Sequence, residues 1–83
     1  MKLTKTAEME ALLFASGDPL TLERAAGALF ITQDEAARLL EELQQQYRQA
    51  DRGIQLRKVA GGWQLVTKKE AAGLVRRLQE KQE

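Results

Sequence analysis

The spacing of apolar side chains predicts two short helices at the start of the chain. The first is expected from about Lys5 to Ser16, with Thr4 or Thr6 accepting hydrogen bonds from its first turn. Gly17–Asp18–Pro19 ends it, because glycine relieves the last turn and proline cannot continue a helix. The second is expected over residues 22–29, capped by Thr21, and Phe30–Ile31 forms a short connection.

A longer third helix is predicted next. Thr32 and Glu35 stand three residues apart and form a capping box at its start. The helix is expected to run from Gln33 to about Ala50, a length of about 25–27 Å. Spacings of four, three, four and three residues keep one apolar stripe toward the core, made of Ala36, Leu40, Leu43, Tyr47 and Ala50.

The period then changes from helix to strand. Residues 54–59 and 63–67 are short β-type runs, and Gly61–Gly62 supplies the positive φ angles of a tight turn. The register stays open: a two-residue loop pairs Ala60 with Trp63, and a three-residue loop pairs Val59 with Trp63. Thr67 and Glu70 are expected to form a second capping box for a last helix with apolar positions Ala71, Leu74, Val75 and Leu78. Residues 79–83 have nothing to bury and are expected to fray.

This order of elements predicts a winged helix-turn-helix in a single domain over residues 1–83. The fold class is mainly α (α+β): three helices, a β-hairpin wing and a C-terminal helix. A generic α+β domain with the same element order is the alternative. A chain of 83 residues has only a small core, and its 43% apolar content is ordinary for a globular protein.

Composition argues against an enzyme. The chain contains no cysteine and no histidine, which removes the usual nucleophilic thiol, general base and zinc ligands together. Gly61–Gly62 lies in a hairpin rather than before a helix, so it is not a phosphate-binding loop. We therefore expect no catalytic residue, no cofactor and no metal. The longest apolar runs are far shorter than the roughly 20 residues that span a bilayer, and no membrane association is expected.

The net charge of +1 hides an asymmetry that bears on DNA binding. Residues 1–51 carry five basic and nine acidic side chains, a net −4, and residues 52–83 carry eight basic and three acidic ones, a net +5. A winged helix reads DNA through its third helix by default. Here that helix is net −2 and begins with Asp34 and Glu35, which would repel phosphates. Direct DNA binding is therefore expected to be weak or absent.

The alternative is a DNA-binding regulator that grips phosphates with a basic wing. The candidate contacts are Arg57, Lys58, Lys68 and Lys69. Solubility and protection of the strand edges explain the same charges without DNA. No stacking pattern accompanies them apart from Trp63, which favours the simpler explanation.

The first helix carries a less usual pattern. Residues 11–15 are all apolar, and at about 100° per residue they cover every direction around the helix axis. In a small domain such a segment is buried on two sides or meets another chain. We therefore predict a contact between chains, with Leu13, Phe14 and Trp63 as its anchors. Two ordinary explanations stay open: Ala11 and Ala15 as small residues at the edge of the core, and Trp63 as a core residue.

Three segments resemble one known family. The opening segment Glu10-Ala-Leu-Leu-Phe-Ala-Ser-Gly-Asp-Pro-Leu-Thr-Leu-Glu-Arg-Ala-Ala26 resembles that of the segregation and condensation protein B family. The segment Val59-Ala-Gly-Gly-Trp-Gln-Leu-Val-Thr-Lys-Lys-Glu70 is similar to the family's wing, in which an aromatic residue follows two glycines. Residues 39–47 match the long helix between them. The resemblance covers nearly the whole chain.

This resemblance implies a winged-helix protein without catalysis. Such proteins form homodimers through their N-terminal winged helix and bind the kleisin subunit of bacterial condensin, which bridges the heads of the SMC ATPase. The implied setting is chromosome segregation in the cytoplasm, at the nucleoid. Family members usually carry a second winged helix, which residues 1–83 do not include, so part of the kleisin-binding surface is expected to be missing. Dimerisation is the property expected to remain.

Overall fold

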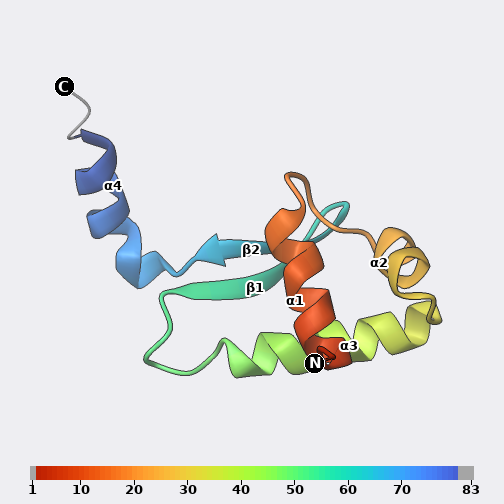
Figure 1. Ribbon diagram of the computed structural model, residues 1–83. Helices are drawn as coiled ribbons and strands as arrows, with labels where there is room; N and C mark the ends of the chain where they lie inside the picture. The colour runs from red at the N-terminus through yellow and green to blue at the C-terminus, as the bar shows by residue number, and fades with distance from the viewer. Residues whose placement is uncertain (1, 81–83) are drawn as a thin grey trace.

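The computed structural model describes residues 2–80, and its elements follow the expected order (Figure 1). Three helices come first and an antiparallel hairpin follows them. A single 3₁₀ turn then leads into the last helix. The elements are α1 (Lys5–Ala15), α2 (Leu22–Leu29), α3 (Gln33–Gln46), β1 (Ile54–Val59), β2 (Gly62–Thr67), η1 (Lys69–Ala71) and α4 (Ala72–Glu80). The mixed α+β winged-helix architecture is confirmed.

Side-chain caps begin the first three helices as the sequence predicts. The hydroxyl of Thr4 accepts from the amide of Ala7 at 3.1 Å, and the hydroxyl of Thr21 accepts from the amide of Arg24 at 3.1 Å. At the start of α3 the Thr32 hydroxyl accepts from the Glu35 amide at 3.0 Å, and the Glu35 carboxylate accepts from the Thr32 amide at 2.9 Å. Each cap satisfies an amide that the helix itself leaves unpaired.

The predicted C-terminal end of the third helix was wrong. α3 ends at Gln46, and residues 47–51 form turns in which the Arg48 amide donates to the Gln45 carbonyl. Tyr47 is buried, but Ala50 is exposed and does not extend the core stripe. Beyond Tyr47 the chain has passed the end of the core, so a longer helix would bury nothing. The turn also frees the Gln49 carbonyl to accept from Lys68 Nζ at 2.7 Å.

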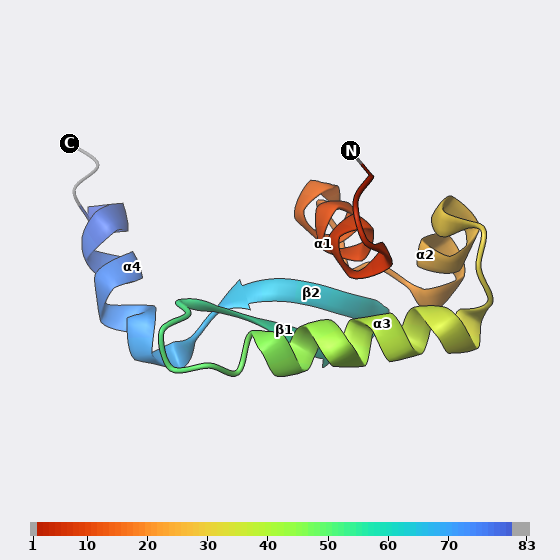
Figure 2. The same cartoon turned by 60° about the horizontal axis from the view of Figure 1, so that its bottom comes forward.

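The core forms where α1 and α2 lie over one side of α3 and the hairpin closes the remaining side (Figure 2). α1 turns Met9 and Leu13 inward, α3 contributes Leu40, and β1 contributes Leu56. Burial of such side chains is the main source of stability in a domain of this size. The remaining buried apolar residues are Leu20, Ala25, Ala26, Ala36, Leu43, Tyr47 and Trp63.

The hairpin has a register that neither expectation gave. Val59 pairs with Gly62 and Lys58 with Trp63, so the loop is Ala60–Gly61 rather than a loop that includes both glycines. Gly61, at φ +90, makes the turn, while Gly62 belongs to β2. A Cβ on Gly62 would lie 2.4 Å from the Leu20 carbonyl oxygen. Gly62 is therefore needed for the close passage of another segment, which shifts the turn back by one residue.

The capping box predicted for the last helix was wrong. Thr67 is the final residue of β2, and the chain enters η1 from Lys68 without any side-chain cap. α4 stands away from the rest of the molecule (Figures 1 and 2). Its apolar positions Leu74 and Leu78 are consequently exposed rather than packed on the core. In the predicted frayed tail, Gln79 and Glu80 are helical, and residues 81–83 lie outside the described part.

The turn between α2 and α3 has an unusual residue at its start. Phe30 ends α2 in the left-handed conformation, with φ 57 and ψ 47, and its side chain is 94% exposed. Glycine is the common residue at such a helix end, because a side chain there costs about 1 kcal/mol. The ring of Phe30 contributes almost no burial in return.

Candidate protein interface

Neighbouring residues on α1 face opposite environments. Leu13 is 5% exposed and packs in the core, whereas Phe14 is 84% exposed. One residue along a helix rotates the side chain by about 100°, so the inward position of Leu13 turns Phe14 outward. Ala11 and Ala15 are exposed as well, so the outer side of α1 is apolar.

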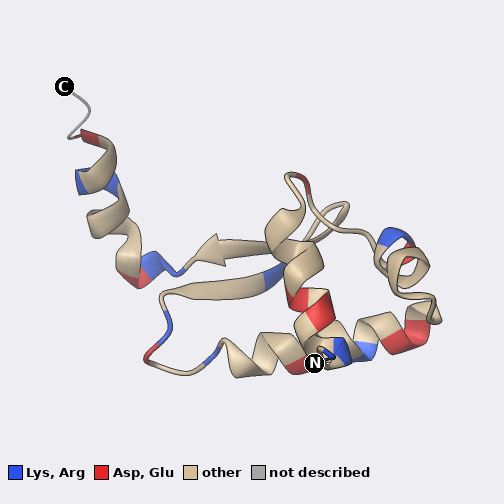
Figure 3. Cartoon of the chain, viewed as in Figure 1, with Lys and Arg blue, Asp and Glu red and all other residues tan. Residues whose placement is uncertain are grey.

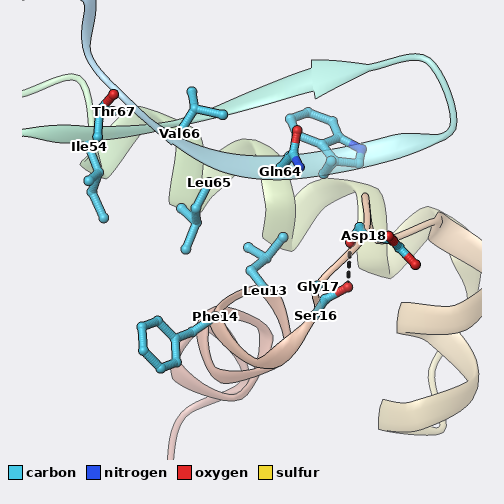
Figure 4. A pocket seen from close by; sticks show the side chains of 11 residues that line it. Leu13, Phe14, Ser16, Gly17, Asp18, Ile54, Gln64, Leu65, Val66 and Thr67 are labelled. Carbon is cyan, nitrogen blue, oxygen red and sulfur yellow. Dashed lines mark hydrogen bonds between the residues drawn. The ribbon is translucent and has the colours of Figure 1, made fainter. Parts of the chain in front are cut away.

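An apolar surface extends from Phe14 toward the hairpin. We call it the Phe14 patch, and it consists of Leu3, Ala7, Ala11, Phe14, Ile54 and Leu65, which line a cavity of about 360 Å³ together with Glu10 and Tyr47. Ile54 and Leu65 extend from the hairpin toward the side on which Phe14 lies (Figure 4). An exposed contiguous apolar patch on a small domain commonly marks a protein interface.

Tyr47 fixes the polar edge of the Phe14 patch. Its hydroxyl donates a hydrogen bond to the Glu10 carboxylate, and Arg52 lies 5.8 Å from its ring centroid. Burial, followed by the hydrogen bond to Glu10 and the negative charge of that carboxylate, raises the pKa of Tyr47 to about 12. The contact joins α1 to the end of α3 and so holds the patch residues of α1 in place.

A second cavity, of about 400 Å³, lies beside the patch. We call it the edge groove: it runs between β2, on one side, and the end of α1 with Ser16–Asp18, on the other (Figure 4). The Ser16 hydroxyl donates to the Asp18 carbonyl and fixes that connection. Leu13, Phe14, Ile54 and Leu65 contribute apolar lining. Phe14, Ile54 and Leu65 therefore border both cavities.

The three predicted interface anchors have different positions. Phe14 belongs to the Phe14 patch and is exposed. Leu13 and Trp63 are 5% and 6% exposed, so each packs mainly within this chain, and Lys58 Nζ lies 5.9 Å from the Trp63 ring centroid. The sequence analysis did not single out Ile54 and Leu65. The two-residue period that places Ile54 on the same face as Leu56 was the available signal.

The four predicted phosphate contacts do not form one cluster. Arg57 and Lys58 are consecutive in β1 and therefore point to opposite faces of the hairpin. Lys58 lies over Trp63, and Lys68 donates to the Gln49 carbonyl. Lys69 is exposed in η1. Basic residues are spread over α2, α3, the connection to β1, the hairpin and α4 (Figure 3), an arrangement that does not favour a phosphate-binding wing.

The first turn of α3, the helix that would read DNA, is acidic. Asp34 and Glu35 lie in the first turn of α3, and Glu41 and Glu42 are exposed farther along. The hydrogen bond from the Thr32 amide lowers the pKa of Glu35, which keeps that carboxylate charged. A carboxylate at this place complements the helix dipole but repels a phosphate backbone.

Within residues 2–80, no three His, Cys, Asp or Glu side chains come together in a way that could hold a metal ion. None of the helices in that range has the length and apolar character needed to cross a membrane.

Comparison with protein families gives one match that covers almost the whole chain. Residues 7–83 match the family described as segregation and condensation complex subunit ScpB. Among curated proteins, segregation and condensation protein B of Geobacillus kaustophilus is 47% identical over 75 residues, 89% of this chain and 35% of that protein. The protein of the same name from Symbiobacterium thermophilum is 44% identical over 70 residues, 84% of this chain and 32% of that protein. The chain thus spans about a third of the length of these relatives.

Solved structures give the same fold. A crystal structure described as a dimer of the ScpB N-terminal domain complexed with ScpA peptide superimposes with a TM-score of 0.84 at 46% identity, covering 88% of this chain and 91% of that one. ScpB from Mycobacterium tuberculosis superimposes with a TM-score of 0.85 at 27% identity, covering 95% of this chain and 51% of that one.

Proposed function

The chain belongs to the segregation and condensation protein B family, and from this premise we propose that it is a non-catalytic interaction module. It pairs with a second copy of itself and holds a segment of the kleisin subunit, ScpA, in the bacterial condensin complex. Through the kleisin it is connected to the SMC ATPase. It acts in the cytoplasm, at the nucleoid, in chromosome segregation.

The exposure of Phe14 is the observation that carries the pairing. A phenylalanine that is 84% exposed, with apolar neighbours along the same helix side, loses a large solvent contact when a second surface covers it. A patch of this kind on one chain fits the same patch on another across a two-fold axis. The related N-terminal domain with a TM-score of 0.84 is described as a dimer, which supports the pairing of this chain with a second copy.

The binding of the kleisin rests on the same relative. That domain is described in complex with an ScpA peptide, and 91% of its length has a counterpart in this chain. We extend this binding to the present chain. The acidic start of α3 and the dispersed basic residues give no comparable support for binding to DNA.

Two measurements on one preparation test the proposal. Sedimentation equilibrium of the chain at micromolar concentration is expected to give a dimer, and a strict monomer would contradict the pairing. Co-purification with the central segment of ScpA from the same organism is expected to retain the chain. The same experiment with a longer chain that includes the following region shows whether that region adds affinity. Absence of ScpA in both experiments would remove the kleisin role.

A further inference from the structure

The outer edge of β2 already has the first contact of a third strand. The amide of Leu20 donates to the Trp63 carbonyl at 2.8 Å, and the amide of Trp63 donates to the Leu20 carbonyl at 2.9 Å. These two bonds form an antiparallel bridge on the side of β2 that faces away from β1. The chain before Leu20 then leaves the sheet through Ser16–Asp18 toward α1, so the bridge is not continued.

The next backbone groups along this edge are unpaired. In an antiparallel pair the amide and carbonyl of alternate residues point to opposite sides of the strand. The backbone amide and carbonyl of Trp63 point away from β1, so those of Leu65 and Thr67 do the same. The backbone groups of the residues between them bond to β1. Within residues 2–80, no hydrogen bond joins the backbone of Leu65 or Thr67 to a segment outside the hairpin. The edge thus presents two amides and two carbonyls at the spacing of an extended chain.

The edge groove lies directly beside these groups. Gln64 to Thr67 form one wall, Ser16–Asp18 and the end of α1 form the other, and Leu13, Phe14 and Ile54 supply apolar surface (Figure 4). A segment in this space can bond to the β2 edge and place alternate side chains against the apolar lining. This combination is the binding mode of strand addition, in which backbone bonds give affinity and side-chain contacts give specificity.

We propose that the edge groove binds an extended segment of ScpA as an added strand of the sheet, bonded to the backbone of Leu65 and Thr67. This inference rests on the proposed function, since it names the binding mode of the same partner. The segment runs antiparallel to β2, which continues the direction set by Leu20. Its side chains over Leu65 and Ile54 are apolar, and an acidic residue lies at the end beside Thr67, where Lys69 is exposed.

A single extended chain fits the groove better than a second copy of the domain. The space is bounded on its far side by Ser16–Asp18 and α1. A second β2 edge would carry its own α1 and Ser16–Asp18 into the same space, where the two would collide. Phe14 borders both the groove and the Phe14 patch, so a bound segment passes beside the second protomer of the proposed dimer.

Hydrogen exchange of backbone amides, followed by NMR with and without a synthetic peptide of the ScpA central segment, tests the proposal. In the free chain the amides of Gln64 and Val66 are expected to be protected, because they bond to β1, and those of Leu65 and Thr67 to exchange fast. Addition of the peptide is expected to slow Leu65 and Thr67 at least about tenfold. Protection that appears without peptide and rises with the concentration of the chain would assign the edge to a second copy and overturn the proposal.

A matched pair of variants gives an independent readout. Thr67→Pro removes the outward amide without breaking the hairpin, because proline is tolerated where the amide faces away from the partner strand. It is expected to weaken peptide binding about tenfold. Thr67→Ala keeps the amide and is expected to bind as the wild type does. An unchanged thermal midpoint in both variants shows that the fold is intact.

The outcomes separate this proposal from the proposed function. If the ScpA peptide binds but leaves Leu65 and Thr67 unprotected, or binds Thr67→Pro and the wild type equally, strand addition is wrong and the kleisin role stands. If the peptide does not bind at all, and a longer ScpA segment does not either, the kleisin role and the binding mode fall together.

Discussion

Leu20 and Trp63 are 43 positions apart in the sequence and exchange a pair of backbone hydrogen bonds, of 2.8 and 2.9 Å. The pair ties the connection between α1 and α2 to the wing, so the hairpin is held from both α3 and this connection. Gly62 makes the pair possible, because its missing side chain lets the Leu20 carbonyl pass.

Replacing Gly62 with alanine is expected to destabilise the domain. The Cβ would lie 2.4 Å from the Leu20 carbonyl oxygen, and φ +143 is strained for any other residue. The free energy of unfolding, measured by urea denaturation, is expected to fall by about 2–4 kcal/mol. Gly53→Ala is the matched control, since no atom lies within 4 Å of the position of its Cβ. Equal stability of the two variants would show that the close passage of Leu20 does not matter.

Phe14→Asp is expected to abolish dimer formation and leave the fold intact. Phe14 is 84% exposed and belongs to the Phe14 patch, so a charge there costs association rather than folding. We expect the dimer dissociation constant to rise at least about 30-fold in sedimentation equilibrium. Phe30→Asp makes the same change at the other exposed phenylalanine, outside the patch, and is expected to leave the dimer intact. Simultaneous loss of folding in Phe14→Asp would instead place Phe14 in the core.

Tyr47 is expected to make stability depend on alkaline pH. Its pKa is about 12 in the folded chain, against an ordinary value of 10.0. Because the folded pKa is the higher one, the contribution is complete below pH 10 and is lost as the pH rises through 12. Urea unfolding across this range is expected to show a loss of about 1–2 kcal/mol in the wild type.

Tyr47→Phe is the control for that titration. It keeps the buried ring but cannot donate to Glu10, so it is expected to be about 1 kcal/mol less stable than the wild type at neutral pH. Its stability is expected to lack the tyrosine-dependent decline between pH 10 and 12. A decline of the same size in both proteins would assign the alkaline transition to other groups.

Duplex DNA is expected not to bind, even at low ionic strength. α3 begins with Asp34 and Glu35, and Lys58 and Lys68 are engaged with Trp63 and Gln49. Fluorescence anisotropy with a labelled duplex checks this expectation. Binding that weakens steeply with salt and is lost in Arg57→Glu would instead establish the basic-wing alternative.

Local chemistry made most of the fold predictable. Thr32 and Glu35 cap each other within four residues, and the spacing of Ala36, Leu40 and Leu43 follows from the helix period alone. These signals need no knowledge of distant contacts. The change from helix to strand after Gly53 is predictable for the same reason, because the spacing of apolar residues changes there.

The errors arose where a distant segment decides the outcome. Gly61 and Gly62 are equivalent as turn residues, and only the Leu20 carbonyl, about 40 positions earlier, separates their roles. The apolar period of α3 continues to Ala50, but the core ends at Tyr47. For the candidate site, the run over residues 11–15 indicated an interface, but the inward direction of Leu13 depends on its packing against the rest of the core.

The left-handed backbone of Phe30 makes the domain less stable than it could be. A glycine at this position would relieve the backbone at no cost in packing, because the ring is almost fully in water. A chain optimised for folding alone would therefore not keep an aromatic residue at this turn. The turn between α2 and α3 is thus the first place to engineer a more thermostable version of the domain, and doing so alters neither the Phe14 patch nor the edge groove.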